Sequence, residues 1–110
     1  MLTEQYCNFD TARLLKEKGF DGEWTDIYVE NPDSTNRAIY PKITQSMAMK
    51  YLRERYKLNI IISVDDLDWF YSIIDYTHKG DVKLLKDLAG FNSFENAADA
   101  AILECLTNLI

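Results

Sequence analysis

The clearest hydrophobic pattern in the chain has the period of a helix and covers residues 45–56. Thr44 before it is a suitable N-cap, and Ile43 is placed to pack against Ala48 in the first turn. We therefore predict a helix from Gln45 to Tyr56, with Tyr51 on the boundary between its faces. At helical spacing an apolar face opposes a polar one, made respectively of Ala48, Met49, Leu52 and Tyr56 and of Ser46, Lys50, Arg53 and Glu54.

The alternating segments predict strands. Leu58 to Val64 places Leu58, Ile60, Ile62 and Val64 on one side, and residues 65–68 after it are polar enough to turn the chain. Residues 69–77 then form the partner strand, with large side chains on both faces, as in a strand that is central in its sheet or covered by another partner. Earlier in the chain, strands over Trp24–Glu30 and Arg37–Tyr40 flank the turn residues 31–36 and run antiparallel.

Three further helices complete the predicted order. Asp10 is expected to cap a helix over Thr11–Lys18 that ends at Gly19, and residues 82–88 are expected to form a short helix ending at Gly90. Ser93 caps the last helix. Its apolar stripe consists of Phe94, Ala98, Ala101, Ile102, Cys105, Leu106 and Leu109.

These elements predict one α+β domain over residues 1–110. The order α-β-β-α-β-β-α-α indicates a small antiparallel or mixed sheet of about four strands with helices packed on one face. A chain of 110 residues has the usual size of a single domain, and 47% hydrophobic with 27% charged residues is an ordinary globular composition.

The ends and the apolar runs bear on the expected location. The longest apolar run, Ala100 to Leu103, is far too short to span a bilayer, so no membrane partner is expected. Residues 1–5 lack the basic start and apolar stretch of a signal peptide. We expect a cytoplasmic protein.

Charge is distributed unevenly. The net charge is −6, which disfavours nucleic acid as a partner, because phosphate neutralisation requires a basic surface. Residues 42–57 are locally basic, with five cations and one acid. The helix cations form a candidate interaction surface for an acidic protein or a nucleic acid, and the alternative is a solvated helix face. They are Lys50, Arg53, Arg55 and Lys57.

Residues with catalytic or metal-binding potential are few. The only histidine, His78, rules out a His-rich metal site, and Cys105 is expected to be a structural residue on an apolar helix face. The acidic run Asp65-Asp66-Leu67-Asp68 lacks the glycine and distal glutamate of a calcium loop. The sequence therefore predicts no cofactor, no metal and no catalytic residue, and it does not favour an enzyme.

Two other surfaces are considered. Leu103 and Ile110 lie opposite the apolar stripe of the last helix, where they are a candidate dimer contact, although scattered exposed apolar residues are also ordinary. Trp24, Trp69 and Tyr71 are candidates to line a small-ligand or enzyme site between sheet and helices.

Three segments carry a resemblance to a known group. They are Leu15-Lys16-Glu17-Lys18-Gly19-Phe20-Asp21, residues 44–54 (Thr-Gln-Ser-Met-Ala-Met-Lys-Tyr-Leu-Arg-Glu) and the helix from Ala97 to Ile110. Together they resemble a family of short uncharacterised proteins from gut Bacteroidetes and their phages and mobile elements. Relatives tend to have Trp at the position of Tyr51. The resemblance covers about half of the chain and implies a bacterial or phage cytoplasmic setting, with no activity and no site residues.

The function that follows is an expectation by class. A non-enzymatic accessory or protein-interaction domain is favoured, with another protein or a second copy of the chain as partner. The alternatives are nucleic-acid binding through the helix around Lys50–Lys57 and a small-ligand or enzymatic site.

Overall fold

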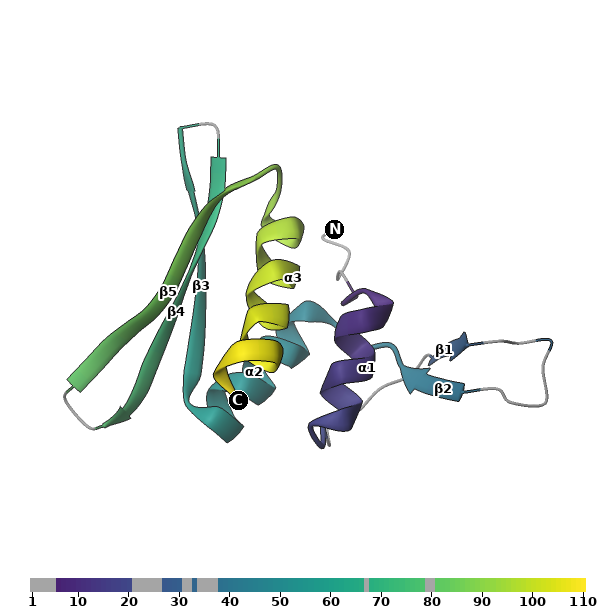
Figure 1. Ribbon diagram of the computed structural model, residues 1–110. Helices are drawn as coiled ribbons and strands as arrows, with labels where there is room; N and C mark the ends of the chain where they lie inside the picture. The colour runs from purple at the N-terminus through teal and green to yellow at the C-terminus, as the bar shows by residue number, and fades with distance from the viewer. Residues whose placement is uncertain (1–5, 21–26, 31–32, 34–37, 67, 79–80) are drawn as a thin grey trace.

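The α+β class is confirmed by the computed structural model, which describes residues 6–20, 27–30, 33, 38–66, 68–78 and 81–110 (Figure 1). The chain ends in a π-helical turn, Cys105–Leu109. Before it, the helices and strands follow in the order α1 (Phe9–Glu17), β1 (Ile27–Glu30), β2 (Ala38–Pro41), α2 (Gln45–Tyr56), β3 (Leu58–Asp65), β4 (Asp68–His78), β5 (Asp81–Phe91) and α3 (Phe94–Glu104).

The described strands divide between two antiparallel sheets. β3, β4 and β5 form a three-stranded sheet with β4 in the centre, and β1 and β2 form a separate hairpin. The helices pack on one face of the three-stranded sheet, as expected, and the hairpin lies on the far side of α1 (Figure 1). The large side chains on both faces of β4 are therefore those of a central strand.

The prediction of a helix over residues 82–88 is wrong, because this segment is part of β5. Its local Lys-Leu-Leu-Lys spacing suits a helix, but pairing along almost the whole of β4 decides its conformation. Gly90, expected to end a helix, has a φ of 98° and lies at an irregularity of the β4–β5 pairing, between the partners of Trp69 and Phe70.

The prediction for α2 is confirmed at both ends. The Thr44 hydroxyl accepts a hydrogen bond from the Met47 backbone N–H at 3.2 Å, and Ile43 and Ala48 are both fully buried. Lys57 ends the helix in the left-handed conformation, with a φ of 59°. β3 begins at the next residue, so the turn at Lys57 fixes the direction in which the sheet leaves the helix.

The start of α1 differs from the prediction. Asn8, and not Asp10, is the N-cap, since its side chain accepts a hydrogen bond from the Thr11 backbone N–H at 2.9 Å. Before the helix, Tyr6 is exposed and forms an isolated antiparallel bridge with Thr44. At the other end, Gly19 has a φ of 87°, in agreement with its expected role after the helix.

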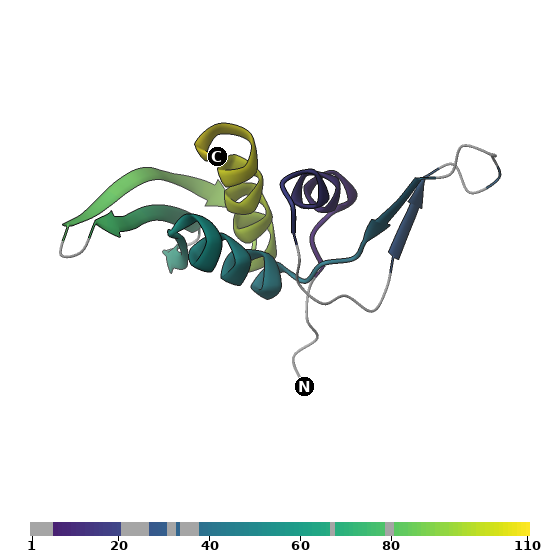
Figure 2. The same ribbon diagram turned by 90° about the horizontal axis from the view of Figure 1, so that it is seen from below.

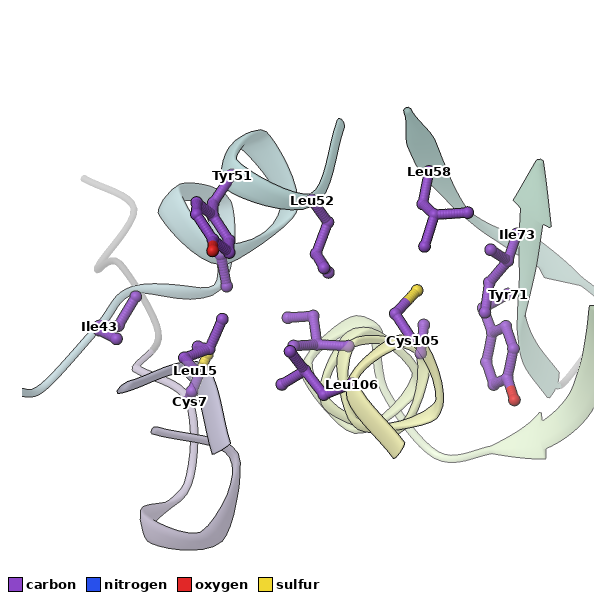
Figure 3. Packing of buried hydrophobic residues seen from close by; sticks show 13 residues of the cluster. Cys7, Leu15, Ile43, Tyr51, Leu52, Leu58, Tyr71, Ile73, Cys105 and Leu106 are labelled. Atoms are coloured by element: carbon purple, nitrogen blue, oxygen red, sulfur yellow. The ribbon is translucent and has the colours of Figure 1, made fainter. Parts of the chain in front are cut away.

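The core is built on both sides of α3 and the π-helical turn that follows it. Figure 2 shows α3 between the three-stranded sheet and α1. In Figure 3, Leu106 lies on the side of Leu15 and Leu52, whereas Cys105 lies on the side of Leu58 and the sheet. Most of the apolar stripe predicted for α3 is confirmed, since Ala98, Ala101, Ile102, Cys105 and Leu106 are buried; Phe94 is exposed.

The hairpin β1–β2 is attached through aromatic contacts. Phe9 at the start of α1 meets the rings of Tyr28 and Tyr40 edge to face, at centroid distances of 5.8 and 5.2 Å. The Tyr28 hydroxyl donates a hydrogen bond of 2.7 Å to the Cys7 carbonyl, and Lys42 lies over the Tyr28 ring. Tyr28 and Tyr40 therefore attach the hairpin to the start of α1 and to Cys7 before it.

Replacing Leu52 by Ala tests the helix layer. Leu52 is fully buried between α2 and α3, so we expect the free energy of unfolding to fall by about 2–5 kcal/mol. Chemical denaturation followed by circular dichroism measures it. Lys50→Ala on the exposed side of the same helix is the control, with an expected change within about 0.5 kcal/mol. Equal effects of the two changes would contradict the packing described.

Candidate interaction surface

The three-stranded sheet has one face that no described helix covers (Figure 1). Tyr71 and Ile73 of β4 are buried against the helices. Because successive side chains of a strand point to opposite faces, Phe70, Ser72 and Ile74 point away from the helices. The strand register extends this outward set to both neighbouring strands.

Three rows of side chains form this surface, which we call the outer face. In the pairing of β3, β4 and β5, each row crosses all three strands. The rows are Ser63–Phe70–Ala89, Ile61–Ser72–Asp87 and Asn59–Ile74–Leu84. Ile61 is 40% exposed and Leu84 is 55% exposed, so the outer face presents large aliphatic side chains to solvent.

The outer face carries almost no charge. Asp87 is the only ionisable residue among its nine members, whereas 27% of the whole chain is charged. On a solvated sheet face, polar and charged residues are usual, and along each strand they alternate with the apolar residues that face the core. The outer face is therefore unlike an ordinary solvent-facing surface, and its chemistry suits contact with another uncharged surface.

The opposite face of β5 is tied to the helix layer. The Lys86 ammonium lies 3.3 Å from a carboxylate oxygen of Glu104, and the Phe91 ring packs against Tyr71 at 5.7 Å. Leu88 also faces this side, since its partner in the register is Tyr71, and it is 48% exposed. Leu84 and Leu88 are thus similarly exposed leucines on opposite faces of one strand.

The four cations of the basic helix are exposed, as expected. At helical spacing Lys50 and Arg53 lie on one side of α2, whereas Arg55 lies near Tyr51 on the other. Within the part of the chain that the structure describes, no ion pair joins Lys50, Arg53, Arg55 or Lys57 to an acid, and the Lys50–Glu54 pair is not formed. Lys50 and Arg53 thus share one side of α2, and Lys57 follows at its C-cap; we call these three residues the basic ridge, and Arg55 is set apart from it.

The candidate dimer contact on α3 is only partly available. Leu103 is half-buried, and Ile110 packs against the core cluster. The side chain of Ile110 is thus already used within the chain, and the two residues do not form an exposed apolar patch.

Of the residues suggested for a small-ligand site, Tyr71 belongs to the core and Trp69 is half-buried. Tyr71 is buried against Phe91, and the Trp69 ring contacts Phe94 edge to face at 6.0 Å. Trp24 lies outside the described residues. The packing of the two described rings leaves them in structural roles.

The acidic turn after β3 is a tight connection between strands. Asp65 pairs with Asp68 in the register, and Asp66 adopts a φ of 51°, as such a turn requires. Asp65, Asp66 and Asp68 are all exposed, and no group of three metal-binding side chains forms among the described residues.

One polar contact joins α1 to α3. The side-chain amide and the backbone N–H of Asn8 both donate to the carboxylate of Asp99. Burial raises the pKa of Asp99, and these hydrogen bonds act in the opposite direction. Asn8 therefore caps α1 and docks it on α3 with the same side chain.

The comparisons with known proteins give no relative. No protein-family model, no curated protein and no solved structure matches the chain. Among the described residues, none of the helices is long and apolar enough to cross a membrane.

The sequence pointed only to the β4 part of the outer face. The large residues on both sides of residues 69–77 predicted a strand that is central in its sheet or covered by another partner. The contribution of β5 was missed because residues 82–88 were expected to be helical. The signal that could have revealed it is the strand-like alternation of Val82, Lys83 and Leu84, which Leu85 interrupts.

Both thiols are expected to be unreactive in the folded protein. Burial raises the pKa of Cys7 and of Cys105 to about 12, so each is a neutral thiol shielded from solvent. With a chromogenic disulfide reagent at pH 8 we expect negligible labelling of the native chain and labelling of both cysteines in denaturant. Rapid stoichiometric labelling of the native chain would contradict the burial of these residues.

Proposed function

We propose that this chain is a non-enzymatic protein-interaction domain that acts through its outer face. The observation that supports the proposal is a sheet face with exposed Ile61 and Leu84, half-buried Phe70 and Ile74, and Asp87 as its one charge. An apolar surface of this kind marks a site of association in a protein whose surface is otherwise highly charged.

The chemistry of the face favours a protein over other partners. A nucleic acid needs cations beside its phosphates, and the outer face has none. A small ligand needs a concave site, whereas a three-stranded sheet face is broad and open. Aliphatic side chains beside small hydroxyl residues suit the packing of another folded surface.

The setting of the proposal comes from the sequence resemblance. We place the domain in the cytoplasm of a bacterium or in a phage or mobile-element gene product, as an accessory protein. In that setting the outer face would join the domain to the complex in which it works.

Lysine substitutions on the outer face test this function. In affinity capture from the native host with quantitative mass spectrometry, Ser72→Lys and Leu84→Lys should each lose the specific partner, because a cation must be desolvated at the contact. Leu88→Lys on the opposite face of β5 is the matched control and should retain it. Equal capture by all variants would contradict the proposal.

A second function is supported by the basic ridge. Lys50, Arg53 and Lys57 are exposed and form no ion pair with a described acid, so they are available to contact phosphates. The net charge of −6 opposes this function, because the rest of the domain repels a polyanion.

A salt titration tests the second function. If the ridge binds nucleic acid, fluorescence anisotropy with a labelled single-stranded oligonucleotide should show binding at low salt that weakens steeply as salt rises. The triple change of Lys50, Arg53 and Lys57 to Glu should abolish it. Binding that is absent at low salt, or indifferent to the triple change, would exclude this function for the ridge.

A further inference from the structure

We infer that the occupant of the outer face is a second copy of this chain, packed sheet against sheet about a two-fold axis. This inference rests on the proposed function, since it names the partner of the same surface. It is carried by the charges, the polar groups and the area of the outer face.

The distribution of charge selects where two copies can meet. Each copy carries a net charge of −6, so most pairs of surfaces repel one another. The outer face is an exception that needs no opposite charge on its partner, because eight of its nine residues are uncharged. A strongly charged partner would gain no ion pair there except with Asp87, so the face favours a partner that is equally uncharged.

The central polar group of the face can pair with its own copy. Ser72 contains both a donor and an acceptor, so the two Ser72 hydroxyls can hydrogen-bond to one another. Ser63 and Asn59 lie on the edge strand β3, where they can keep contact with water. Asp87, which only accepts, lies on the edge strand β5, where it can keep contact with water.

The position of Asp87 also selects the direction of the two-fold axis. A two-fold axis that lies between the sheets, runs perpendicular to the strands and passes between the two Ser72 residues would place the two Asp87 side chains opposite one another. An axis parallel to β4 places them at opposite edges, about 14 Å apart for sheets ~10 Å apart and strands ~4.8 Å apart. That separation exceeds the Debye length of about 8 Å at physiological salt, so their repulsion is largely screened.

With that axis, the central strand meets itself. Phe70 and Ile74 of one copy lie opposite the same residues of the second copy, with the two Ser72 residues between them. Leu84 of each copy lies opposite Asn59 of the other. The resulting core is formed by β4, the strand with large side chains on both faces.

The area of the face predicts a weak dimer. Three strands and about five residues of their length cover roughly 250 Å² per copy. The total is below the 1,200–2,000 Å² or so of a stable interface, which is typical of transient association. We therefore expect a weak dimer that is strengthened by salt, because salt screens the repulsion between two acidic copies.

Analytical ultracentrifugation of the full chain between about 10 µM and 1 mM tests the inference, at low and at moderate salt. The wild type should show a monomer–dimer equilibrium that shifts toward dimer as salt rises. Ser72→Lys places two cations together at the axis, and Leu84→Lys places a cation on each copy within the contact, so each should weaken association at least about tenfold. Within the monomer, a lysine at position 72 lies opposite Asp87 in the strand register, so it gains a carboxylate partner on the neighbouring strand. Circular dichroism checks that both variants fold.

Leu88→Lys is the matched control, since it adds the same charge to the other face of β5 and should leave the dimer unchanged. Equal loss in all three variants would show pairing through the edge of β5 and overturn the inference. A strict monomer at 1 mM would also overturn it. If the chain is a strict monomer, the proposed function would still stand if Ser72→Lys and Leu84→Lys abolished the capture of a host protein. If neither variant changed the capture, both the dimer and the proposed function would be rejected.

Discussion

The burial of α3 on two sides is the constraint on which the other elements depend. One side of this helix and its π-helical turn packs on the three-stranded sheet, and the other side receives Leu15 of α1 and Leu52 of α2 (Figure 3). Ala97, Ala98 and Ala101 are fully buried, and their small side chains let the neighbouring backbones approach. The described helices therefore all lie on one side of the sheet.

Among the described residues, the same constraint leaves the outer face without a covering element. The described helices cover only one face of the three-stranded sheet, so the hydrophobic residues of β4 that point the other way remain at the surface. The Lys86–Glu104 ion pair and the packing of Phe91 on Tyr71 hold β5 against the helix layer. On the opposite face of β5, Leu84 completes the outer face. The surface that we propose for association is thus a consequence of how the core is built.

Local signals explain which elements could be predicted. α2 has a capping hydroxyl at Thr44 and a clear apolar stripe, and its bounds were predicted correctly. β5 could not be predicted in this way, since the local spacing of its Lys-Leu-Leu-Lys segment suits a helix, whereas pairing with β4 decides its conformation. The α1 cap was misplaced by two residues because Asn8 and Asp10 are both good caps, and only the contact with Asp99 distinguishes Asn8. The basic helix was predicted as exposed, but the outer face depends on β5 and became visible only in the structure.

The most direct test of the account is to observe which side chains meet between two copies. In a mixture of isotope-labelled and unlabelled chains near 1 mM, filtered nuclear Overhauser spectra detect only contacts between copies. The account predicts intermolecular contacts from the Phe70 ring and the methyl groups of Ile74 and Leu84. Contacts that instead involve Leu88, Leu103 or Ile110, or no intermolecular contacts at all, would contradict it.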